Sequence, residues 1–105
     1  MLETNQEIRS GWCVVSVQGR ADAETAERLE SALCAAIEQN PKVIANFAGL
    51  SYISSAGLRA VLQAARAAQG RNGEFAVCSL TPSVRRVFDL SGMHHLLSIQ
   101  GELPC

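Results

Sequence analysis

The sequence predicts an α/β fold, with a small mixed β-sheet of four to five strands and about three helices packed against it. Apolar, β-branched runs alternate with segments whose apolar residues recur every three or four positions, which is typical of strands joined by crossover helices. The chain has 105 residues, 48% of them hydrophobic and 18% charged, which suits a single core and excludes a disordered chain. We therefore expect one domain over residues 1–105, with a loose tail at 101–105.

The first half of the chain is expected to begin with an edge strand over residues 2–9 and a central, β-branched strand over residues 12–17, which Gly19 ends. Asp22 then supplies an N-cap oxygen to a helix. Asn40 and Pro41 stop that helix. Residues 42–47 form a second strand, and residues 49–54 form a short connection to the next helix.

The second half repeats the alternation. A helical segment ends at Gly70, and a third strand follows over residues 74–78. Thr81 and Pro82 indicate the N-cap and first position of another helix, and Gly92 suits its left-handed C-terminal residue. Residues 96–99 are a candidate last strand.

Charge and composition exclude several function classes. The net charge of −1 argues against nucleic-acid binding, which needs dense Lys and Arg. No apolar run approaches the length of a membrane span, and the N-terminus has no apolar signal stretch, so we expect a cytoplasmic protein without direct membrane contact. The apolar settings of Cys13, Cys34 and Cys78 favour reduced thiols.

No metal or cofactor is expected. No cysteine has metal-ligand spacing, and no Gly-rich loop ends in Gly-Lys-Ser or Gly-Lys-Thr. His94 and His95 are adjacent, so on a helix or strand they point in different directions and cannot easily bind one metal together. The chain also lacks the Gly-x-Ser-x-Gly elbow of serine hydrolases.

The most informative stretch is residues 50–59, where a strand leads through Ser54 and Ser55 directly into a helix. A serine at a helix N-terminus lies beside unpaired N–H groups and the positive end of the helix dipole, so an anion such as a phosphate is stabilised there. The simpler interpretation is that either serine is only an N-cap. Gly57 removes a side chain beside the site and would let a partner approach.

Three segments in order resemble the STAS domain, specifically the anti-sigma factor antagonists of bacterial partner switches. They are Ser-Tyr-Ile-Ser-Ser-Ala-Gly-Leu-Arg at 51–59, Gly-Arg-Ala-Asp-Ala-Glu-Thr-Ala at 19–26 and Pro-Ser-Val-Arg-Arg-Val-Phe-Asp-Leu-Ser-Gly at 82–92. The resemblance covers roughly residues 5–100. It implies the STAS fold, here without the fourth, C-terminal helix that antagonists commonly carry.

The resemblance also implies a function. The unmodified protein binds an anti-sigma factor that is also a serine kinase, which frees a sigma factor and so regulates transcription. The kinase then phosphorylates Ser55, the complex separates, and a serine phosphatase restores the protein. Ser54 stands where the family has Asp, which makes it a second candidate phosphoacceptor. The implied partner-binding residues are Asp22, Ser54, Ser55, Ala56, Gly57, Leu58 and Arg59.

In this scheme the protein is a substrate and a ligand, not an enzyme. Two alternatives remain open. One is a STAS subunit of a membrane complex for lipid or anion transport, which would bind its ATPase or permease constantly. The other is an enzyme or a nucleotide-binding module, although the sequence has no phosphate loop.

Overall fold

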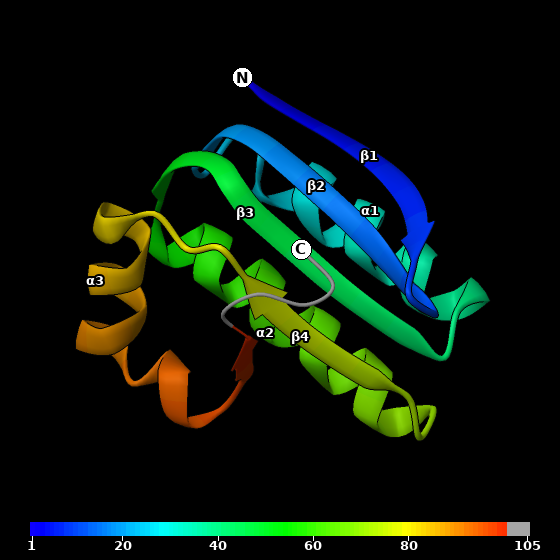
Figure 1. Ribbon diagram of the computed structural model, residues 1–105. Coiled ribbons are helices and arrows are strands. Elements are labelled where there is room, and N and C mark those ends of the chain that lie inside the picture. Colours follow the sequence, from blue (N-terminus) through cyan, green and yellow to red (C-terminus); the bar gives the residue numbers. More distant parts are fainter. Residues whose placement is uncertain (101–105) are drawn as a thin grey trace.

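A five-stranded mixed sheet forms the centre of the protein, for which a computed structural model describes residues 1–100. The strands lie in chain order, and β1 is antiparallel to β2 while every other neighbouring pair is parallel (Figure 1). Their bounds are β1 Leu2–Arg9, β2 Trp12–Ala21, β3 Lys42–Ile53, β4 Glu74–Cys78 and β5 Ser98–Gln100. The predicted mixed sheet is confirmed.

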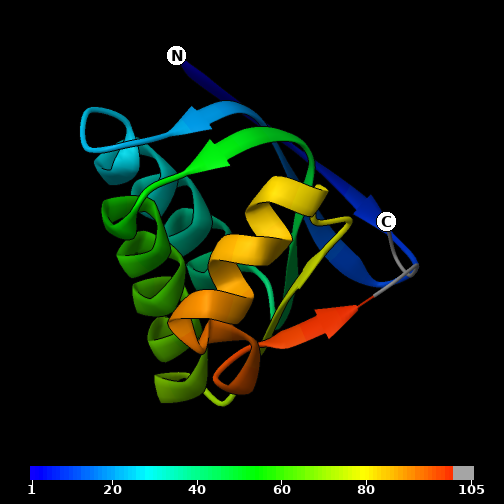
Figure 2. The same ribbon diagram turned by 90° about the vertical axis from the view of Figure 1, so that its left-hand side faces the viewer.

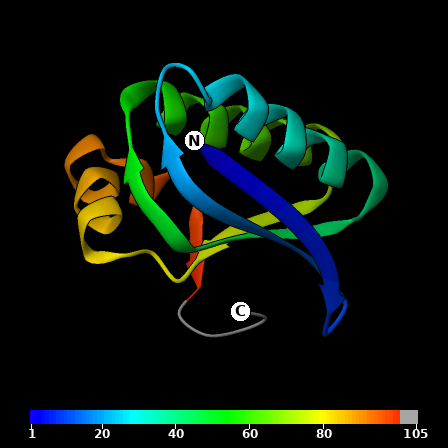
Figure 3. The ribbon, with the colours of Figure 1, turned by 90° about the horizontal axis from the view of Figure 1, so that it is seen from above.

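Two helices, α1 (Ala26–Gln39) and α2 (Ser55–Gly70), lie side by side over the same face of the sheet (Figures 2 and 3). The third, α3 (Pro82–Ser91), is followed by a short 3-10 helix, η1 (Met93–His95). It buries Phe88, whose ring meets Phe47 of β3 edge to face with the ring centroids 6.4 Å apart. These contacts make one main core between the sheet and the three helices.

β2 and β3 are longer than the sequence predicts. β2 continues past Gly19 to Ala21, and β3 continues to Ile53, so the expected connection at 49–54 is mostly strand. The reason is parallel pairing between the two strands, which includes Ala21 opposite Ile53. Glycine favours this close approach, since a Cβ on Gly49 would lie 2.8 Å from Cγ of Gln18.

The second half of the chain matches the prediction more closely. β4 has the expected bounds, Pro82 occupies the first turn of α3, and Gly92 ends that helix at φ 81°. Thr81 does not cap α3 with its side chain; its hydroxyl instead donates a hydrogen bond to the carbonyl of Leu50. The last strand starts at Ser98 rather than residue 96, because η1 and the turn after it take up residues 93–97. The predictions of a loose tail and of no fourth helix lie outside the described residues.

Two cysteines match the expectation of reduced thiols. Cys13 and Cys34 are free thiols, and burial raises the pKa of both, with Glu30 and Glu38 adding to the effect at Cys34. Cys78 is buried in β4, with its Sγ 3.7 Å from the carbonyl oxygen of Ala45. Cys105 lies outside the described residues.

Candidate functional site

The candidate site lies at one edge of the sheet, where β2 and β3 end and the turns into α1 and α2 begin (Figure 3). Strands that run parallel place their carboxyl ends at the same edge, so residues 20–25 and 52–59 meet there. The backbone N–H of Ser54 donates a hydrogen bond of 2.8 Å to the carbonyl of Ala21 and ties the two turns together. The sequence motifs at 19–26 and 51–59 therefore form one surface.

Ser54 is the N-cap of α2. Its backbone is extended, and its hydroxyl oxygen accepts a hydrogen bond of 3.2 Å from the backbone N–H of Gly57. Its carbonyl accepts the first bond within the helix, from the N–H of Leu58. Ser54 thus satisfies one of the donors that a helix N-terminus leaves unpaired.

Ser55 is the first residue of α2 and is exposed. Because Ser54 already caps the helix, the Ser55 hydroxyl is not needed for that role. The sequence left the cap open between the two serines, and the structure assigns it to Ser54. Arg59 lies four residues further along α2, so it shares a helix face with Ser55, and it is also exposed.

The two serines are therefore expected to differ in stability when each is replaced by alanine. Ser54→Ala should lower the free energy of unfolding by about 1 kcal/mol, because it removes the cap bond. Ser55→Ala should change it by less than about 0.5 kcal/mol, since an exposed hydroxyl is lost. Thermal and urea unfolding of the two variants measure this directly. Equal losses would contradict the assignment of the cap.

Gly57 and Leu58 face the interior of the protein. Both are buried, and a Cβ on Gly57 would lie 2.7 Å from Cγ1 of Ile53 and 2.8 Å from the carbonyl oxygen of Ala21. The space that Gly57 leaves is filled by the ends of β2 and β3. The glycine lets α2 begin directly against the sheet, and this contact explains its presence without a partner.

Asp22 organises the turn between β2 and α1. Its Oδ1 accepts hydrogen bonds from the backbone N–H groups of Glu24 and Thr25, at 3.0 and 3.1 Å, and the Thr25 hydroxyl lies 3.2 Å away. The helix itself starts at Ala26, so Asp22 caps the turn before it rather than the first helical turn. Partial desolvation acts to raise the pKa of Asp22, but these hydrogen bonds and the N-terminal ammonium together lower it from its usual value.

The lowered pKa predicts how stability depends on pH. A carboxyl whose pKa is lower in the folded state stabilises the fold above its unfolded pKa, and this contribution disappears as the pH falls through the folded pKa. The difference in stability between the wild type and Asp22→Asn should therefore shrink in acid. Carboxyl NMR should show Asp22 titrating below a free aspartate, and a midpoint at or above that value would contradict the turn geometry.

Arg20 and Tyr52 also lie at this edge, although no pattern in the sequence singles them out. The guanidinium carbon of Arg20 lies 4.3 Å from the centroid of the Tyr52 ring, a cation–π contact on an exposed surface. Register shifts accompany this end of the β2–β3 pair, and one falls between Gly19 and Arg20. The contact depends on that shift, so strand patterns alone do not reveal it.

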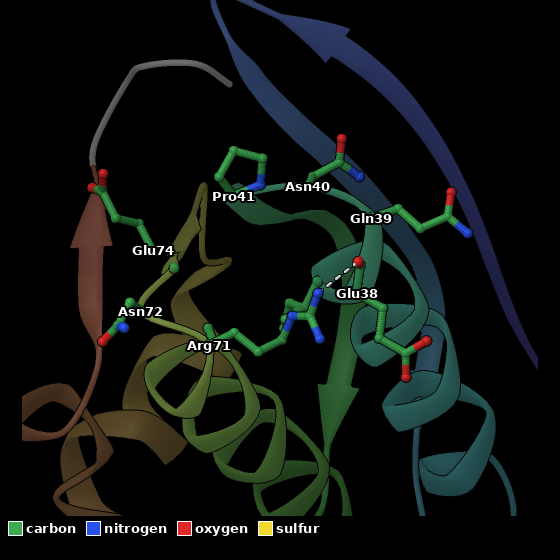
Figure 4. A pocket seen from close by; sticks show the side chains of 10 residues that line it. Glu38, Gln39, Asn40, Pro41, Arg71, Asn72 and Glu74 are labelled. Carbon is green, nitrogen blue, oxygen red and sulfur yellow. Dashed lines mark hydrogen bonds between the residues drawn. The ribbon is translucent and has the colours of Figure 1, made fainter.

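A polar cavity of about 290 Å³ lies at the opposite edge, between the C-terminal ends of α1 and α2 (Figure 4). Arg71 crosses it and donates a hydrogen bond of 3.0 Å to the carbonyl of Glu38. Helix C-termini carry negative partial charge, which the arginine offsets. The cavity is therefore explained by contacts within the protein and shares no residue with the candidate site.

The histidines correct one expectation, because the rings of His94 and His95 lie together with their centroids 3.9 Å apart. The two residues end a short 3-10 helix rather than a regular helix or strand. Among residues 1–100 no cluster of three or more His, Cys, Asp or Glu residues is arranged to hold a metal. In the same part of the chain, no helix has both the length and the apolar character to cross a membrane.

Comparison with the sequences of known proteins finds one matching domain family and relatives of one kind. A family model described as the STAS domain matches residues 2–103. BtrV of Bordetella bronchiseptica, described as a candidate anti-sigma factor antagonist, is 40% identical over 83 residues, covering 78% of this chain and 72% of that protein. An anti-sigma F factor antagonist from Paenibacillus polymyxa is 27% identical over 100 residues, covering 93% of this chain and 86% of that protein.

Solved structures of anti-sigma factor antagonists are also similar to this chain in fold. An anti-sigma factor antagonist from Mycobacterium paratuberculosis is similar with a TM-score of 0.83 and 27% identity, over 98% of this chain and 88% of that one. The antagonist SpoIIAA in its unphosphorylated form gives a TM-score of 0.75 at 26% identity, over 95% and 90% of the two chains. The phosphorylated form of Bacillus SpoIIAA gives 0.69 at 25% identity, over 95% and 93%.

Proposed function

Since the chain belongs to the STAS domain family and is homologous to anti-sigma factor antagonists, we propose that it works as a partner switch controlled by phosphorylation of Ser55. In its unmodified form it binds an anti-sigma factor that is also a serine kinase, and the sigma factor is released. Phosphorylation of Ser55 ends that binding, and a serine phosphatase reverses the modification. The protein itself is a regulatory protein and not an enzyme.

The observation that carries this proposal is the separation of roles between the two serines. Ser54 holds the end of α2 through its bond to Gly57, which leaves Ser55 exposed at the helix N-terminus. A kinase can reach such a hydroxyl without unfolding the helix. A phosphate there also meets the positive end of the helix dipole, worth roughly 0.3–1 kcal/mol, so the modified protein keeps its fold.

The departure of this sequence from the family pattern fits the same geometry. By the resemblance of residues 51–59 to the family motif, Ser54 stands in the place of an Asp, and both residue types are favoured as N-caps because each accepts a hydrogen bond from the helix. The hydroxyl of Ser54 makes that bond here. What is lost is a negative charge beside the phosphoacceptor, not the cap. This observation favours Ser55 over Ser54 as the modified residue.

The proposal also covers the domain, its location, its partners and its contact surface. Residues 1–105 act as one STAS domain in the cytoplasm, with an anti-sigma factor kinase and a phosphatase as protein partners and no cofactor or nucleic acid. The exposed side chains of Ser55 and Arg59, with Asp22, Ser54 and Ala56 at their margin, form the partner contact. Gly57 and Leu58 support that surface from below, since both are buried.

The first test is the site of phosphorylation. Incubated with its cognate anti-sigma factor kinase, ATP and Mg²⁺, the protein should gain one phosphoryl group on Ser55, because this hydroxyl is exposed and Ser54 is occupied by its cap bond. Tandem mass spectrometry locates the group. Ser55→Ala should prevent phosphorylation, and the Ser54→Ala variant should still gain the phosphoryl group. A phosphate mapped to Ser54 would overturn the assignment.

A further inference from the structure

The stacked pair of Arg20 and Tyr52 lies at the same edge of the sheet as Ser55 but has no role in the scheme above. The two residues are direct neighbours on β2 and β3. The next residue of each strand, Ala21 and Ile53, is buried in the core, so Arg20 and Tyr52 project from the other face of the sheet. Both are exposed, Tyr52 to 40%.

The backbone links this pair closely to the phosphoacceptor. Ala21 follows Arg20 and accepts the hydrogen bond from the N–H of Ser54, the residue before Ser55. Tyr52 precedes Ser55 by only three positions. The pair and Ser55 therefore stand at the same edge of the sheet, where a single bound protein can touch both.

A local irregularity sets the position of Arg20. Gly19 pairs with Leu50, so a regular register would place Arg20 opposite Ser51, but the shift places it opposite Tyr52 instead. Gly19 adopts φ +105°, and a Cβ there would meet the carbonyl oxygen of Met1, which also accepts a hydrogen bond from the N–H of Arg20. Such irregularities re-aim side chains and are frequent beside functional sites.

Charge indicates what the pair would bind. Within the described part of the chain, the ion pairs are Arg9–Glu7, Arg85–Asp89 and His94–Asp89, and none involves Arg20. The Asp22 carboxylate nearby is occupied by its own turn. A guanidinium whose face lies on an aromatic ring still offers its edge, which matches a carboxylate with two parallel hydrogen bonds.

We infer that Arg20, held on the Tyr52 ring, is a second anchor of the partner surface and binds a carboxylate on the anti-sigma factor. Arginine and tyrosine are among the residue types that most often dominate protein interfaces, and their contact strengthens when a partner excludes water. This inference rests on the proposed function, because it names a further contact of the same complex.

The test compares variants in titration calorimetry against the purified anti-sigma factor kinase that phosphorylates this chain. Arg20→Ala should weaken binding about tenfold or more, and Arg20→Lys should not restore it, since an ammonium lacks the planar fork. Tyr52→Ala should also weaken binding, and Tyr52→Phe, which keeps the ring, should lose less. The combined Arg20→Ala and Tyr52→Ala loss should be smaller than the product of the single losses, because the two residues act as a unit.

The chain offers a matched control at the far end of the same strands. Lys42 of β3 lies over the ring of Trp12 of β2, with Nζ 5.7 Å from the ring centroid, and Lys42 is also exposed. Lys42→Ala should change affinity by less than twofold. Thermal melts of every variant should stay close to the wild type, which separates lost binding from lost folding.

The outcomes distinguish this inference from the proposed function. If Ser55→Asp weakens binding but Arg20→Ala stays within twofold of the wild type, the second anchor is wrong and the switch stands. If Lys42→Ala weakens binding as much as Arg20→Ala does, the second anchor is also wrong, because the loss would then reflect the total charge of the protein and not the position of Arg20. If the unmodified wild type does not bind the kinase, both are wrong.

Discussion

Phosphorylation of Ser55 is expected to lower the affinity for the anti-sigma factor kinase by about ten- to a hundredfold, which corresponds to roughly 1.4–2.8 kcal/mol. A phosphoryl group adds about −1.5 to −2 charges, and placing it in a packed contact brings desolvation and repulsion from nearby acids. The same charge is favourable at the N-terminus of α2. The loss should therefore appear in binding and not in the melting temperature.

Calorimetry of defined variants measures this effect. Ser55→Ala should bind like the unmodified protein, and Ser55→Asp should bind more weakly, though less so than phosphoserine because Asp carries less charge and a shorter side chain. Ser31→Asp, at an exposed serine of α1, adds the same charge away from the site and should leave affinity unchanged. If Ser31→Asp weakens binding as much as Ser55→Asp, net charge and not position controls the complex.

Gly57→Ala is expected to destabilise the protein by about 2 kcal/mol, which lowers the melting temperature by about 10 °C in a domain of this size. The added Cβ would stand 2.8 Å from the carbonyl oxygen of Ala21, a backbone atom that no side-chain rotation can move. The N-terminus of α2 must therefore shift away from β2, and the bond between Ser54 and Ala21 weakens with it.

Gly70 provides the matched control on the same helix. A Cβ there would have no atom within 4 Å, so Gly70→Ala should be neutral or stabilise the protein by up to about 1 kcal/mol through helix propensity. Urea unfolding of both variants gives the comparison. Equal stabilities of Gly57→Ala and the wild type would show that the contact with β2 does not position α2.

Local signals in the sequence predicted the elements that depend on local chemistry. Pro82 and Gly92 delimited α3 correctly, because a proline in the first turn and a left-handed glycine at the end act within a few residues. The length of β3 was not predictable in this way, since residues 49–53 are extended through pairing with β2, far away in the sequence. The pairing of β3 with β2 therefore keeps Gly49 in a strand, although the sequence predicts a connection there.

The candidate site likewise combines features that the local sequence predicts with features that depend on tertiary contacts. The sequence placed Ser54 and Ser55 at a helix N-terminus, which is correct, but the choice of cap required the bond between Ser54 and the N–H of Gly57. The sequence also assigned Gly57 to the partner surface, whereas its missing side chain makes room for Ala21 and Ile53. Arg20 and Tyr52 meet only because the strand register shifts, and no spacing of residues in the chain encodes that shift.

The most direct test of the switch follows one complex before and after addition of ATP. Native mass spectrometry or gel filtration of this protein with its anti-sigma factor kinase should show an intact complex in the absence of ATP. After ATP and Mg²⁺ are added, the wild-type complex should separate as Ser55 is phosphorylated, and the Ser55→Ala complex should remain intact. If both complexes separate, or if the phosphorylated wild type stays bound, Ser55 does not control the partner.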